Sequence, residues 1–187
     1  MNEIDSSASS VSPAYADPAP RKHIKRVRLA LFLSSLAACL GVSLIGGISL
    51  GLSQALMGAM GVGRVMPFES TFLGGLTTGL QLSALNFVLF FVTVPAAWIA
   101  LGFSIGRMPH RRIAAKRPYV RWAVIWGAIL VGGTTGGFGL IESVVTGLGA
   151  LVSGASVGAL AGVGCGLLFY AIVRPAEQLR DVDVNVF

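Results

Sequence analysis

Long apolar segments alternate with short charged segments along the chain. Four stretches contain no Asp, Glu, Lys or Arg: 29–63, 70–106, 122–141 and 143–173. A hydrocarbon core of about 30 Å needs about 20 apolar residues in an α-helix, and runs this continuous do not alternate as the strands of a membrane β-barrel do. The pattern predicts an all-α integral membrane protein with four transmembrane helices. We place them at about 29–52, 80–104, 122–141 and 149–173.

The charged residues are confined to the segments that join these runs. Of the 14 Lys and Arg residues in the 187-residue chain, all except Arg64 precede the first span, connect the second to the third, or follow the fourth. Cytoplasmic segments beside membrane helices carry such an excess of basic residues. We therefore expect both termini in the cytoplasm, an arrangement that a three-span or five-span chain would lose. The excess of Arg over Lys, with much Ala and Gly, favours a bacterial inner membrane.

The segments outside the spans define three regions. Residues 1–20 are rich in Ser, Ala and Pro and predict a disordered cytoplasmic tail, 21–174 form the membrane domain, and 175–187 form a cytoplasmic C-terminal tail. For that tail we favour a frayed end over a strand that pairs with a partner. The link at 53–79 is too apolar for an ordinary loop. We expect it to lie in the membrane interface; the alternatives are a projecting continuation of the first span and a re-entrant segment.

Small residues recur at every fourth position in three of the four spans. Such spacing lets two helix backbones approach closely, which matters in a membrane because apolar burial between helices gains nothing over lipid. The sequence predicts glycine-zipper packing through these faces, within the chain or between copies. The residues expected to make the contacts are Ser43, Gly47, Gly51, Gly132, Gly136, Gly154, Gly158, Gly162 and Gly166.

Polar side chains inside the spans define a second set of candidates. Asn86 and Thr93 lie in the second span, and Thr134 and Thr135 interrupt four glycines in the third. Such residues line a solute path in some membrane proteins, and in others they hydrogen-bond between helices or to their own helix. We favour hydrogen bonding and keep a polar path near Asn86 and Thr134 as the alternative. At the outer ends, Arg64 and Glu142 are candidates for an ion pair.

The one match to a catalytic motif lies in a structural context that does not suit catalysis. The run "GASVG" at 154–158 matches G-x-S-x-G, but it lies inside an apolar helix and both histidines, His23 and His110, lie on the cytoplasmic side. The two cysteines fall inside spans without His or acidic company, so we expect neither a disulfide nor a metal site. We expect no catalytic residues and no cofactor, and the basic link offers too few aromatic rings for nucleic-acid binding.

These observations predict a small multi-pass membrane protein without catalytic activity. We expect an accessory or assembly subunit that packs through its glycine-rich faces, in a homo-oligomer or in a larger membrane complex. The alternative is a small channel or transporter. The basic cytoplasmic segments predict contact with anionic lipid headgroups of the bilayer.

Overall fold

The computed structural model describes residues 25–61 and 68–183, and every regular element in these two ranges is helical. Five α-helices and two short 3-10 turns follow one another along the chain. They are α1 (Val27–Ala59), α2 (Phe68–Ser104), η1 (Ile105–Arg107), η2 (Pro109–Arg111), α3 (Lys116–Glu142), α4 (Val144–Val173) and α5 (Pro175–Asp183). The stretches Val27–Ala59, Lys116–Glu142 and Val144–Leu179 are long and apolar enough to cross a membrane, which is compatible with a multi-pass membrane protein.

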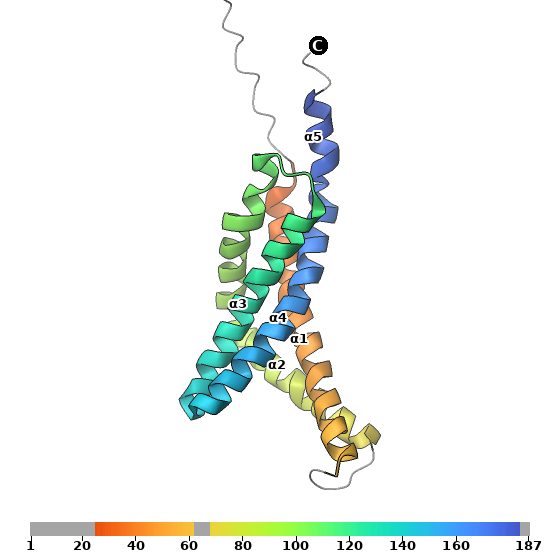
Figure 1. Ribbon diagram of the computed structural model, residues 1–187, viewed down its shortest axis with the longest axis vertical. Coiled ribbons are helices and arrows are strands. Elements are labelled where there is room, and N and C mark those ends of the chain that lie inside the picture. Colours follow the sequence, from red (N-terminus) through yellow and green to blue (C-terminus); the bar gives the residue numbers. More distant parts are fainter. Residues whose placement is uncertain (1–24, 62–67, 184–187) are drawn as a thin grey trace, which may run out of the picture.

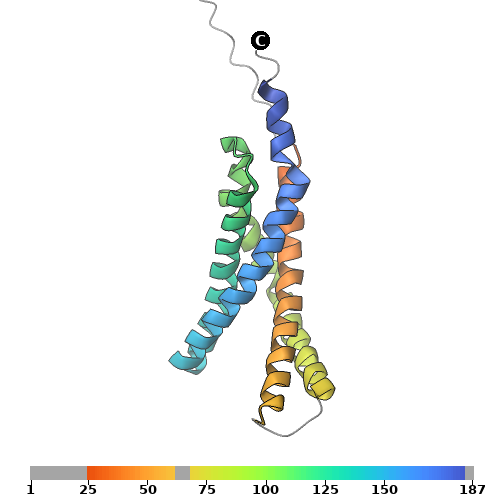
Figure 2. The ribbon, with the colours of Figure 1, turned by 45° about the vertical axis from the view of Figure 1, so that its right-hand side comes forward.

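The helices form two antiparallel hairpins, α1–α2 and α3–α4, that meet at one end and spread apart at the other (Figures 1 and 2). The end where they meet carries the start of α1, the link between α2 and α3, and the end of α4. Contact between the hairpins comes mainly from α1 against α4, whereas α2 and α3 touch at few positions. The two hairpins are therefore joined at one end and diverge toward the other (Figures 1 and 2).

A compact apolar core holds the joined end together. Leu31 of α1, Ile105 of η1, Tyr119 of α3 and Phe169 of α4 are all buried in one cluster. The rings of Tyr119 and Phe169 stack with their centroids 5.9 Å apart. The Tyr119 hydroxyl donates a hydrogen bond of 2.6 Å to the carbonyl of Ile113, which ties the α2–α3 link to the top of α3. These contacts fix the two hairpins to each other at the joined end, and the hairpins diverge from there.

The ends of α4 have local causes. Ser143 alone separates α3 from α4, and its hydroxyl caps α4 by accepting a hydrogen bond of 3.1 Å from the backbone N–H of Thr146. At the other end, Arg174 takes a left-handed conformation with φ of 45°. Pro175 follows as the first residue of α5, a position where its missing N–H costs nothing.

The structure adds detail to three parts of the chain whose form the sequence left open. Helices α1 and α2 both continue into 53–79, which agrees for α1 with the alternative of a projecting continuation of the first span. Their packing explains the extension, because a Cβ atom on Gly75 would lie 2.6 Å from the Cα of Gly51, so the two backbones touch there. The C-terminal tail forms the helix α5 as far as Asp183, and residues 184–187, on which most of the expected frayed end falls, lie outside the described residues. The "GGTTGG" segment at 132–137 leaves α3 continuous, so its four glycines do not interrupt the helix.

Candidate functional site

The glycines of α4 lie against the backbone of α3. A Cβ atom on Gly162 would lie 2.8 Å from the carbonyl carbon of Ala123, and one on Gly166 would lie 2.7 Å from the Cα of Val120. Gly158 faces Gly127 so closely that a Cβ on either residue would collide with the carbonyl oxygen of the other. Real carbon contacts prefer 3.5–4.0 Å, so no side chain larger than hydrogen fits at these positions without a shift.

The same interface continues toward the spread end of the hairpin. A Cβ on Gly132 would lie 3.0 Å from the carbonyl oxygen of Leu151, and one on Gly136 would lie 2.8 Å from the Cβ of Leu151. Sequence reasoning missed Gly139 and Gly147, which approach each other near the α3–α4 turn, and it missed Gly127. Fourfold spacing gave no signal for these positions, because Val131 and Thr135 stand between Gly127 and Gly139 on that row of α3 and Leu151 follows Gly147 on α4.

Thr135 makes a polar contact inside this interface. Its hydroxyl lies 2.9 Å from the carbonyl oxygen of Ala150 on α4 and 2.8 Å from that of Val131 on its own helix. The hydroxyl carries one proton, so the two carbonyls share it. Gly154 leaves the room for this contact, since a Cβ there would collide with the Thr135 hydroxyl. Thr134, by contrast, bonds only to carbonyls of α3, those of Leu130 and Val131.

The small residues of α1 contact a different neighbour. A Cβ on Gly47 would lie 3.6 Å from the Leu76 side chain of α2, and one on Gly51 would lie 3.0 Å from the Phe72 carbonyl oxygen. Gly47 and Gly51 therefore pack within the α1–α2 hairpin. Ser43, the first residue of that series, lines a cavity between the hairpins instead.

That cavity, which we call the interhairpin cavity, lies where the two hairpins begin to diverge. It has a volume of about 500 Å³ and is lined by all four long helices. Thr93, Thr134 and Thr135 all contribute to its wall, so the structure brings three of the four residues of the predicted polar path to one place. The fourth, Asn86, has a side chain outside the described part of the structure.

The wall of the interhairpin cavity is mostly aliphatic and aromatic. Leu36, Leu40, Leu130, Val131 and Trp126 form much of it, together with the two cysteines. Cys39 places its sulfur 4.0 Å from the Thr93 hydroxyl. The Trp126 indole nitrogen is buried, and no hydrogen-bond acceptor for it lies among the described residues. The chemistry of this wall suits an apolar occupant better than a hydrated ion.

The predicted outer ion pair cannot be assembled from the described residues. Glu142 ends α3 with its side chain exposed. Arg64, its expected partner, lies outside the described ranges.

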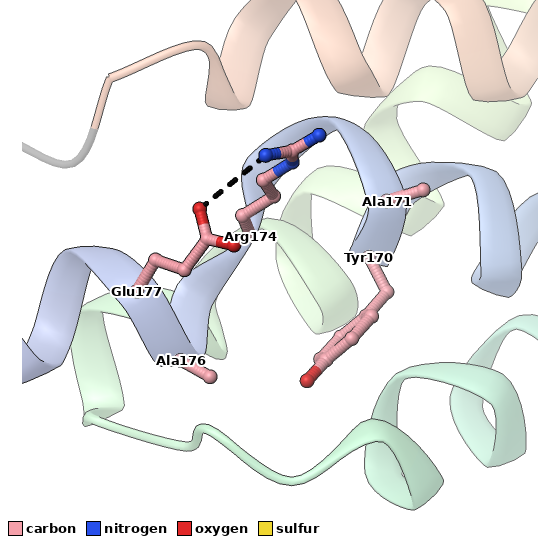
Figure 3. Close-up of a pocket in the computed structure, with 5 residues that line it drawn as sticks. All are labelled: Tyr170, Ala171, Arg174, Ala176 and Glu177. Atoms are coloured by element: carbon pink, nitrogen blue, oxygen red, sulfur yellow. Dashed lines mark ion pairs between the residues drawn. The ribbon is translucent and has the colours of Figure 1, made fainter.

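A smaller hollow of about 220 Å³ lies at the junction of α4 and α5 (Figure 3). Tyr170, Arg174 and Glu177 line it, and the Arg174–Glu177 ion pair spans 3.5 Å between exposed side chains. The Tyr170 hydroxyl donates a hydrogen bond of 3.2 Å to the carbonyl of Ala114 in the α2–α3 link. The two charged side chains that line the hollow are exposed and already paired with each other, and exposed ion pairs contribute little energy. We therefore interpret the hollow as the junction of two helices rather than as a ligand site.

Basic residues are frequent in the segments that form the joined end of the molecule, and Figure 1 shows how these segments lie together. They come from the start of α1, the α2–α3 link with the first turns of α3, and the end of α4. Those in the described ranges are Lys25, Arg26, Arg28, Arg107, Arg111, Arg112, Lys116, Arg117, Arg121 and Arg174. We call this set the basic end.

Comparison of the chain with protein-family models, with curated proteins and with solved structures gives no match. Within the described residues, no three His, Cys, Asp or Glu side chains are grouped closely enough to hold a metal ion. The features that bear on function are therefore the glycine interface, the interhairpin cavity and the basic end.

Proposed function

We propose that the chain is a four-span protein of the bacterial inner membrane with both termini in the cytoplasm. The fold supports this topology, because the basic residues of three separate segments gather at one end of the helices. A positively charged end of this kind is typical of the cytoplasmic side. Helix α2 has 37 residues, which gives it a length of about 55 Å and makes it long enough to be the fourth span.

Within that membrane, we propose that the protein is a non-catalytic assembly subunit. The observation that carries this proposal is a second pair of glycines on α3, Gly133 and Gly137. They lie beside Gly132 and Gly136, which pack on α4, yet a Cβ on either would have nothing within 4 Å. Glycines four residues apart on an exposed helix face let another transmembrane helix approach closely. The partner is a second copy of this chain or a helix of a larger membrane complex.

The size of the complex in mild detergent tests this role. We expect the wild-type protein to migrate as a particle larger than the 19.4 kDa chain in its micelle, and Gly133→Leu to shift it toward the monomer. Gly164→Leu is the matched control, since Gly164 also has open space around it but stands between Leu160 and Leu168 rather than in a small-residue pair. A wild-type monomer, or equal behaviour of the two variants, would refute the assembly role.

A channel or transporter is the second candidate, and the position of Thr93, Thr134 and Thr135 around one cavity favours it. In that case water has to reach the cavity wall. Thr134→Cys, in a background without Cys39 and Cys165, should then react with a small water-soluble thiol reagent. The assembly role instead predicts no reaction there, because the wall is mainly apolar and an apolar cavity excludes water.

A further inference from the structure

The interhairpin cavity combines three properties that together identify its occupant. Its volume of about 500 Å³ falls in the range of pockets that hold small organic ligands. Its wall is mostly apolar, and the few hydroxyls in it include that of Thr134, which already donates to carbonyls of its own helix. A cavity of this chemistry gives water too few partners, while leaving it empty would forfeit the dispersion contacts of its wall. An apolar molecule is the occupant that meets both conditions.

The cavity is closed toward the joined end and open to one side, between α2 and α3. On the side of the joined end, the buried cluster around Tyr119 and Phe169 closes it. Laterally, α2 and α3 touch at few positions, and between them Ala96 and Thr134 are exposed although both line the cavity. An occupant therefore enters between α2 and α3 from the surrounding bilayer.

The positive charge next to this opening favours anionic lipids over neutral ones. The helices that flank the opening reach the basic end, where Arg107 follows α2 and Lys116 begins α3. The lining segment of α1, Leu36 to Ser43, lies roughly 15–25 Å along the helix from Val27. A lipid with its headgroup at the level of the basic end can therefore lay an acyl chain beside this segment, and basic residues near a membrane surface attract anionic headgroups.

We propose that the interhairpin cavity is a binding site for one acyl chain of an anionic phospholipid, whose headgroup lies at the basic end beside Arg107 and Lys116. The chain lies along Trp126 and Leu130 and fills the space that the diverging hairpins leave. This inference rests on the membrane topology proposed above and is independent of the assembly role.

Fluorescence quenching of Trp126 by brominated lipids tests the proposal. Trp98 and Trp122 are replaced by Phe, and the protein is reconstituted into phosphatidylcholine vesicles that contain a phosphatidylglycerol or a phosphatidylcholine with brominated acyl chains. Each basic residue near the surface enriches an anionic lipid about fivefold, so contacts with both Arg107 and Lys116 should lower the amount of brominated phosphatidylglycerol needed for half-maximal quenching by about 25-fold. The double variant Arg107→Gln/Lys116→Gln should remove that preference. Equal quenching by the two lipids in the unsubstituted protein would overturn the anionic site.

Two controls separate the cavity from the outer surface. Trp98 is 43% exposed and does not line the cavity, so as the sole tryptophan it should be quenched equally by both lipids. Ala96→Phe, which fills the opening, should reduce the quenching of Trp126, whereas Ile99→Phe, at a 52% exposed position outside the cavity, should not. Undiminished quenching in Ala96→Phe would overturn the proposal, as would quenching of Trp126 by acrylamide in place of lipid. Failure to quench Trp98 would instead contradict the membrane topology.

Discussion

Replacing Gly158 by alanine is the smallest change that challenges the α3–α4 interface. The new methyl group would lie 2.7 Å from the carbonyl carbon of Gly127 and 2.8 Å from the Cβ of Val131. Both distances are far inside the 3.5–4.0 Å that carbon atoms prefer, so α3 has to move away by about 1 Å. We therefore expect Gly158→Ala to destabilise the hairpin although alanine is the better helix former.

The magnitude follows from comparison with Gly164 on the same helix. A Cβ at Gly164 meets nothing within 4 Å, so Gly164→Ala should gain the full helix-propensity difference of about 1 kcal/mol. Gly158→Ala has the same intrinsic gain, opposed by an overpacking cost of about 1–3 kcal/mol. The shift of α3 also opens gaps at the other positions of the interface, and a gap of about 0.5–1 Å loses about a quarter to a half of the dispersion energy of each contact there. Since the propensity terms cancel, Gly158→Ala should be less stable than Gly164→Ala by about 1–3 kcal/mol.

Reversible unfolding in mixed detergent micelles, followed by circular dichroism, measures this difference. Both variants add one methyl group to the same helix, so hydrophobicity and insertion are matched between them. If Gly158→Ala proves as stable as Gly164→Ala, then α3 and α4 do not approach as closely as described. The packing explanation for the α4 glycines would then be refuted.

Two further predictions concern single hydroxyl groups. Thr135→Val removes the hydrogen bond to Ala150 on α4 and should lower the free energy of unfolding by about 0.6–1.7 kcal/mol. Thr134→Val loses hydrogen bonds only within α3, so it should lower the free energy of unfolding by less, and the same unfolding assay compares the two variants. Tyr119→Phe removes the hydrogen bond of 2.6 Å to the Ile113 carbonyl and should lower the free energy of unfolding by about 1 kcal/mol. Amide hydrogen exchange in the α2–α3 link should become faster. Unchanged exchange there would mean that this hydrogen bond does not hold the link.

The helices could be predicted from the sequence because they depend on local information. Runs without charge identified the apolar segments, although the link expected between 141 and 149 is reduced in the structure to Ser143 alone. The helix ends were harder to predict, because α1 and α2 continue past the expected limits where Gly51 and Gly75 bring their backbones together. Nothing in the periodicity of one helix reveals a contact made by the next one.

The candidate site could be predicted only in part, for the same reason. Fourfold spacing identified the α4 glycines as a packing face, but it could not say that their neighbour is α3 or that Gly127 completes the contact. The interhairpin cavity depends on the angle between two hairpins, and that angle is set by the cluster around Tyr119 and Phe169, whose members come from α1, α2, η1, α3 and α4. No single stretch of sequence contains that information.

Cysteine accessibility in intact cells tests the proposed membrane topology most directly. In a background with Cys39 and Cys165 replaced, Ala114→Cys places a thiol in the exposed α2–α3 link at the basic end, and Glu142→Cys places one at the opposite end of α3. A membrane-impermeant thiol reagent added outside should label position 142 and leave position 114 unlabelled until the cells are opened. Labelling of position 114 in intact cells would contradict the topology on which the proposed function depends.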